Sequence, residues 1–108
     1  MSELVQKLSQ GEHPVEVSIR PDRTPGALKN CIDKGYVHLK FTQTKGGTDL
    51  YIPLDLPSSD LSQGDFERGV GTIRLSGQLT LDYVPVRCHA EIDLSTMAGH
   101  GRLEPLNP

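Results

Sequence analysis

The segment from Gly71 to Leu94 alternates apolar and polar residues along most of its length. Period-two alternation of this kind is typical of β-strands that bury one face and expose the other. The parity of the pattern changes between Tyr83 and Val84, just before Pro85. A change of parity requires a turn or a bulge, because one extra residue sends every later side chain to the opposite face. The segment therefore predicts a long amphipathic β-hairpin that bends at Val84-Pro85.

Three shorter segments repeat the alternation, at residues 15–20, 36–41 and 49–54. The last two are joined by residues 44–48, which predict a hairpin loop because their two adjacent glycines readily adopt the positive φ angles of a tight turn. Pro53 cannot donate a ladder hydrogen bond, so the third of these strands is expected to lie at a sheet edge or to stop there. These segments add three strands to the predicted hairpin.

Two short helices are indicated by their caps. The first covers residues 2–10 and is closed by Gly11. The second begins at Thr24-Pro25, because threonine caps free N–H groups and proline at the first helical position loses no hydrogen bond, and it ends at Gly35. Each helix carries one apolar face, formed by Leu4, Val5 and Leu8 in the first and by Ala27, Leu28, Cys31 and Ile32 in the second.

The remaining segments lack a regular pattern. Residues 56–69 form a long polar connection, which predicts either a docked crossover without a function of its own or a lid or binding loop. Gly77 falls at an inward position of the predicted hairpin and indicates a bend or a second turn. The residues after Leu94 are interpreted as a glycine-flanked loop followed by a proline-containing tail.

Strands dominate this pattern, and the strand–helix alternation of a parallel sheet is absent. We therefore expect a single β-rich domain over residues 1–108, an antiparallel sandwich or small barrel of five to seven strands with one or two short helices. The 11 glycines and 8 prolines fit short strands joined by many turns. The expected core consists of Val17, Leu28, Val37, Leu39, Ile52, Ile73, Leu75, Leu81, Val86 and Ile92.

The balance of charges argues against some partners. A net charge of −3 gives no electrostatic attraction to nucleic acids or to anionic membranes. One small basic cluster occurs, but acidic residues interrupt it and no aromatic residues lie between its members. The cluster comprises Arg20, Arg23, Lys29 and Lys34, interrupted by Asp22 and Asp33. Neither a nucleic-acid nor a membrane partner is expected.

Cysteine usage and the N-terminus indicate a cytoplasmic protein. A small secreted domain usually carries more cysteines than Cys31 and Cys88, so both are interpreted as reduced thiols. Both thiols lie among apolar residues and are expected to pack in the core rather than to react. The N-terminal segment lacks the long apolar core of a signal peptide, and no segment approaches the roughly 20 apolar residues that span a bilayer.

The sequence around His89 suggests metal chemistry but does not complete a site. His89 and Glu91 match the His-x-Glu pattern of zinc nucleobase deaminases, but the two cysteines that should follow downstream are missing. A site built from His38 and His89 would require their strands to pair, and it would need Glu91 or Asp82 as a third ligand. We interpret the histidines as surface residues and predict no metal and no cofactor.

A polar row formed by Arg87, His89, Glu91 and Asp93 lies along one face of the second hairpin strand, with Arg74 and Asp82 on the polar face of the first. Cross-strand ion pairs worth about 0.2–1 kcal/mol each would make this a solvent-facing, salt-bridged sheet. In the functional interpretation, the same face is the floor of a polar cleft or a contact surface for a partner. The candidate binding residues are His38, Tyr51, Arg74, Arg87, His89 and Glu91.

No nucleophile–base pair, complete metal set or phosphate loop can be assembled from the sequence. We therefore expect a small non-enzymatic accessory or protein-interaction domain, whose partner is another protein or a second copy. A homodimer would join through a strand edge or sheet face that includes residues 84–96. The alternative is a small-molecule-binding β-barrel, or an enzyme with a polar site at the barrel mouth. That mouth would be lined by the 56–69 connection, His38, Tyr51 and His89.

Overall fold

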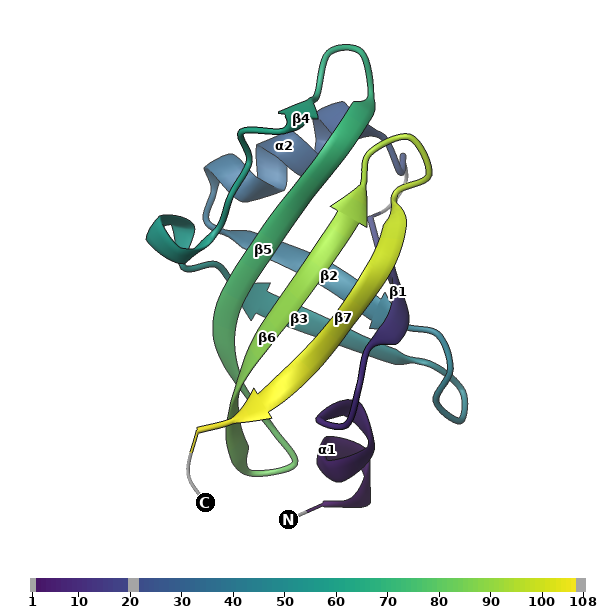
Figure 1. Cartoon of the computed structure of the whole chain (residues 1–108), viewed down its shortest axis with the longest axis vertical. Helices are drawn as coiled ribbons and strands as arrows, with labels where there is room; N and C mark the ends of the chain where they lie inside the picture. The colour runs from purple at the N-terminus through teal and green to yellow at the C-terminus, as the bar shows by residue number, and fades with distance from the viewer. Residues whose placement is uncertain (1, 20–21, 107–108) are drawn as a thin grey trace.

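The computed structural model describes residues 2–19 and 22–106, which form one seven-stranded antiparallel sheet and two short α-helices (Figure 1). The strands lie in the order β3-β2-β1-β7-β6-β5-β4, and the sheet is not closed into a barrel. The expected mainly β fold is thus confirmed, whereas the expected barrel is not formed. The elements are α1 (Glu3–Leu8), β1 (His13–Val17), α2 (Pro25–Asp33), β2 (Tyr36–Phe41), β3 (Thr48–Pro53), β4 (Gly64–Asp65), β5 (Val70–Leu81), β6 (Val84–Asp93) and β7 (Ala98–Pro105).

The N-terminal half follows the sequence pattern, although α1 is shorter than the expected 2–10 and β1 lies at His13–Val17 rather than at residues 15–20. Ser2 and Thr24 cap the two helices, since each side chain accepts a backbone N–H from the first turn. The loop between β2 and β3 contains Gly46 and Gly47 with φ angles of 75° and 76°. β3 is an end strand of the sheet, as Pro53 predicted. Arg20, expected in the first strand and the basic cluster, lies outside the described residues.

The turn of the long hairpin lies earlier than the sequence predicted. Leu81 pairs with Val84, so Asp82 and Tyr83 are the two turn residues, with φ angles of 50° and 66°. Positive φ at both central positions is the mark of a type I′ turn, which fits the twist of the flanking strands. The predicted bend at Val84-Pro85 is therefore wrong, because both residues already belong to β6. A change of parity shows that a turn exists but not which residues form it.

The largest error of the sequence interpretation concerns β7. The residues after Leu94 were expected to form a loop and a tail, but Ala98–Pro105 pairs with β6 on one side and with β1 on the other. Glycines at two inward positions hide the alternation of this strand. A side chain at Gly99 would clash with the carbonyl oxygen of Glu91, so close packing of β6 and β7 requires glycine there. Because β7 covers β6, the free strand edge expected within residues 84–96 does not exist.

The core lies between two parts of the sheet that cross each other, β2–β3 behind β5–β7 in Figure 1. Every expected core residue is buried except Leu81, which is partly buried and packs against the core. Helix α1 adds Val5 and Leu8 to the core, and α2 adds Leu28 and Ile32. Neither helix of the described chain is long and apolar enough to cross a membrane.

The 56–69 connection docks along the outer edge of β5 as a crossover. The N–H of Asp55 donates to the carbonyl oxygen of Ser76 at 2.8 Å, and Asp60 and Arg74 exchange two backbone hydrogen bonds of 2.8 and 2.9 Å. Further along, the short strand β4 pairs with the start of β5. Gly77 does not interrupt β5; a side chain there would clash with the end of β3, which explains the glycine.

A candidate recognition face on β5, β6 and β7

Four of the six candidate residues lie together on the outer face of β5, β6 and β7. Pairing of these strands places Arg74, Glu91 and His100 in one cross-strand row and Ser76, His89 and Arg102 in the next. The apolar residues that alternate with them point into the core, which leaves the charged set on the outside. The polar face comprises Arg74, Ser76, Gln78, Arg87, His89, Glu91, His100, Arg102 and Glu104.

The other two candidates, His38 and Tyr51, lie on β2 and β3, where they are cross-strand neighbours. They form an aromatic cluster with Tyr36: the rings of Tyr36 and Tyr51 stack with centroids 5.3 Å apart, and His38 meets Tyr51 edge-on at 5.3 Å. β2 pairs with β1 and β3, whereas β6 pairs with β5 and β7. His38 and His89 are therefore not on paired strands, so the strand pairing that a two-histidine site would require is not formed. Because the sheet is not closed into a barrel, His38, Tyr51 and His89 do not line a barrel mouth together either.

The first row of the polar face holds an exposed ion pair. Nε of Arg74 lies 3.3 Å from Oε2 of Glu91, and the two side chains are 74% and 57% exposed. Exposed pairs contribute little to stability, because both charges are already well solvated. This pair is thus available for contacts with another molecule at small cost to the fold.

Arg87 has a different role, because it ties the connection after β3 to the sheet. Its Nη1 donates to Oγ of Ser76 at 3.0 Å and lies 3.3 Å from Oδ2 of Asp55. The Arg87 side chain is only 21% exposed, and Ser76 is the one buried polar residue of the described chain. The backbone N–H of Ser76 in turn donates to Oγ of Ser59 at 3.0 Å. Arg87 is therefore a structural residue rather than a free binding group.

His89 is partly engaged by Glu104, whose Oε1 lies 3.0 Å from Nε2 of the imidazole. This hydrogen bond lowers the pKa of the Glu104 carboxyl, and the nearby charges of His89, Arg102 and Arg87 lower it further. The carboxylate is thus held in its charged form. Arg102 itself forms no ion pair with any residue that the structure describes.

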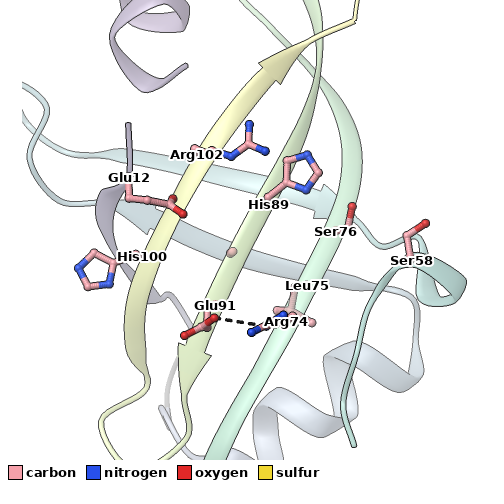
Figure 2. Close-up of a pocket in the computed structure, with 10 residues that line it drawn as sticks. Glu12, Ser58, Arg74, Leu75, Ser76, His89, Glu91, His100 and Arg102 are labelled. Carbon is pink, nitrogen blue, oxygen red and sulfur yellow. Dashed lines mark ion pairs between the residues drawn. The ribbon is translucent and has the colours of Figure 1, made fainter. Parts of the chain in front are cut away.

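The polar face is hollowed around Arg74, Glu91 and His100. A depression of about 320 Å³ is lined by Glu12, Ser58, Arg74, Leu75, Ser76, His89, Ala90, Glu91, His100 and Arg102 (Figure 2). Two further depressions, of about 290 and 550 Å³, adjoin it, and Glu91 lines all three. In Figure 2, Arg74 and Glu91 point toward each other across the floor. The result is a shallow groove, open to solvent and centred on the Arg74–Glu91 pair.

Sequence reasoning missed the residues that β7 contributes to this face. His100, Arg102 and Glu104 were read as part of a loop and a tail, although they alternate with Gly99, Gly101 and Leu103. That alternation was the available signal, since glycine can occupy an inward position where two strands approach closely. Glu12 and Ser58 reach the groove from other segments, and no sequence pattern marks them.

The chain was also compared with known proteins. No protein-family model matches it, and no curated protein sequence is significantly similar to it. The polar face is therefore interpreted from its own chemistry.

Within residues 2–19 and 22–106, no three His, Cys, Asp or Glu side chains are grouped so that they could hold a metal ion. Across the same ranges, no hydrogen bond joins a serine or cysteine to a histidine. Cys88 points into the core, where burial raises the pKa of its thiol to about 12. A protonated, buried thiol of this kind is not a nucleophile.

Proposed function

We propose that this protein is a small non-enzymatic interaction module and that a partner protein docks on the polar face. The observation that carries the proposal is the exposed Arg74–Glu91 pair, in which Arg74 lines two of the three adjoining depressions and Glu91 lines all three. Complementary charges across an interface steer association and fix which partner is accepted. A face with both signs of charge within one row provides such a pattern.

The shape of the groove favours a macromolecular partner over a small ligand. Small-molecule sites are typically enclosed and mostly apolar, with a few polar groups that fix orientation. Here the lining is mostly charged or polar, and the groove is open over three strands. The supporting scaffold is one antiparallel sheet that packs on a core of buried apolar side chains, which would hold the outer side chains in fixed positions.

A charge exchange tests this proposal. The variant R74E/E91R keeps an ion pair within the chain but reverses the pattern that a partner meets. We expect the wild-type protein to capture its partner from the native cell and the exchange variant to bind that partner at least about tenfold more weakly. The control is K29E/D33K, which exchanges an exposed ion pair on α2 whose two residues line none of the three depressions. Equal binding by R74E/E91R and wild type, with K29E/D33K unchanged, would exclude the polar face as the docking site.

A second candidate function is the binding of a small anion. It is favoured by His89, His100 and Arg102, which bring potential positive charge to one depression of about 320 Å³. Inorganic phosphate and citrate would serve as probes in a thermal shift assay. A rise in melting temperature that R102A abolishes, with no protein partner recovered, would support this alternative.

The two free thiols also support a proposed place of action in the cytoplasm. Cys31 is partly buried and Cys88 is buried, and neither forms a disulfide in the described chain. Reducing compartments keep thiols in this state. Fractionation of the native cell with a tagged chain would test the location.

A further inference from the structure

The two edges of the sheet differ in whether another segment of the chain covers them. The outer edge of β5 is covered by the connection 55–65, which supplies backbone hydrogen bonds and the short strand β4. β3, at the other end of the sheet, pairs along Thr48–Pro53 with β2 and with no other strand among residues 2–19 and 22–106. Free strand edges are templates for pairing with another strand, and natural proteins usually cover or blunt them. The open edge of β3 is therefore a place where another chain can be added.

One hydrogen bond shows which backbone N–H and C=O groups of β3 point away from β2 and are free to pair. The N–H of Leu54, just beyond β3, donates to the carbonyl oxygen of Gly35 on the β2 side at 2.8 Å. Backbone groups of successive residues point to opposite sides of a strand, so the even-numbered residues of β3 bond to β2. Asp49 and Tyr51 direct their N–H and C=O groups outward. Pro53 also faces outward but has no N–H.

We propose that a second copy of the chain pairs with this edge, antiparallel and about a two-fold axis at Leu50. Residues that lie directly opposite each other in an antiparallel pair have their side chains on the same face of the sheet. Near the middle of β3, this rule allows the two-fold axis to pass through Asp49, Leu50 or Tyr51. A centre at Asp49 sets two carboxylates directly opposite each other, which is destabilising. A centre at Tyr51 pairs Asp49 with Pro53, which has no N–H and whose carbonyl oxygen lies against Gly77 of β5.

The register centred at Leu50 avoids both problems. It pairs Asp49 of each copy with Tyr51 of the other, and each pair exchanges two backbone hydrogen bonds. On the outer face, the two Tyr51 rings become diagonal neighbours, within reach of aromatic side chains. Tyr51 is 54% exposed and already stacked on Tyr36, so the contact buries a preordered aromatic ring. Rigid aromatic anchors of this kind dominate the energy of many interfaces.

Two substitutions at one position test the register. Both Y51D and Y51K remove the ring, but Y51D places a carboxylate opposite Asp49 of the second copy, whereas Y51K places an ammonium group there. We expect the wild type to show a monomer–dimer equilibrium in sedimentation experiments between micromolar and millimolar concentration. The dimer of Y51D should be at least about tenfold weaker than that of Y51K, because two repulsive pairs replace two attractive ones.

A double variant controls for effects on folding. D49N/Y51D removes the repulsion while keeping the substitution at position 51, so it is expected to dimerise better than Y51D. Circular dichroism on each variant checks that the sheet is retained. A wild type that sediments as a monomer up to millimolar concentration overturns the proposal. So do Y51D and Y51K variants that are folded and weakened to the same extent.

Discussion

Single residues on the polar face divide into those that hold the fold and those that remain available to a partner. Arg87 is mostly buried and donates to Ser76 and Asp55, so its charge is used within the chain. Arg74 and Glu91 pair in open solvent, where a partner can replace or extend their contacts. The sequence placed Arg74, Arg87 and Glu91 on one face, as the structure does, but it also placed Asp82 there, which lies in the turn. It could not show which of these charges are free, because burial depends on which segment covers each side chain.

The first prediction contrasts two arginines of this face. R87A removes a donor from the buried Ser76 hydroxyl and releases Asp55, and it should cost about 1–3 kcal/mol of the free energy of unfolding. R74A removes only an exposed ion pair and should change stability by less than about 0.5 kcal/mol. Urea unfolding of both variants measures the difference. Equal effects would show that the tether between Arg87 and the 55–59 segment is not formed.

The second prediction concerns the thiols. Burial raises the pKa of Cys88 to about 12, so this thiol stays protonated and shielded near neutral pH. In the folded protein, a disulfide reagent should modify Cys31 alone, which is only partly buried, and both thiols should react after unfolding. The C31S variant is the control and should show no reactive thiol until it unfolds. Rapid modification of folded C31S would contradict the burial of Cys88.

The third prediction concerns acid. Asp60 and Asp93 each accept hydrogen bonds from the hydroxyl and N–H of a serine two residues on, and these bonds lower the pKa of both carboxyls. Because the folded pKa lies below the unfolded value, the stabilisation is present above about pH 4 and is lost as pH falls through the folded pKa. The S62A/S95A variant should lose part of this dependence. Urea unfolding at pH 3 and at pH 7 measures how much the free energy of unfolding changes with pH. The same change in the variant and in the wild type would contradict the prediction.

Among the elements, β7 has the greatest effect on the architecture. It pairs with β1 on one side and with β6 on the other. The two crossing parts of the sheet are therefore joined by backbone hydrogen bonds into one sheet. β7 also closes the edge of β6, so a dimer joined through a free strand edge within residues 84–96 is excluded, whereas a dimer through the sheet face stays a prediction.

A pair of glycine substitutions tests this account of the elements. G99A should destabilise the protein, because the added Cβ would clash with the carbonyl oxygen of Glu91 where β6 and β7 approach. G26A should stabilise it by up to about 1 kcal/mol, since a Cβ at this helical position meets no atom within 4 Å. Melting temperatures should therefore move in opposite directions. A neutral or stabilising G99A would argue against the pairing of Ala98–Pro105.

The sequence predicted elements well wherever apolar residues mark the inward positions. The strands around Leu39 and Ile52 and the capped helices are examples. The sequence did not predict β7, because Gly99 and Gly101 occupy its inward positions in place of apolar residues. Glycine is needed there because β6 lies so close, and the sequence of β7 alone does not show this contact. The sequence also could not tell that His38 and His89 lie on strands that do not pair, since strand order depends on contacts far apart in the chain.

At the scale of the whole molecule, we propose that a partner protein binds the polar face. Diethylpyrocarbonate labelling of histidines offers the most direct measurement, because His89 and His100 line the groove whereas His38 lies in the aromatic cluster on β2–β3. The captured partner should slow the labelling of His89 and His100 and leave the labelling of His38 unchanged. Protection of His38 with no protection of the other two histidines would contradict the claim.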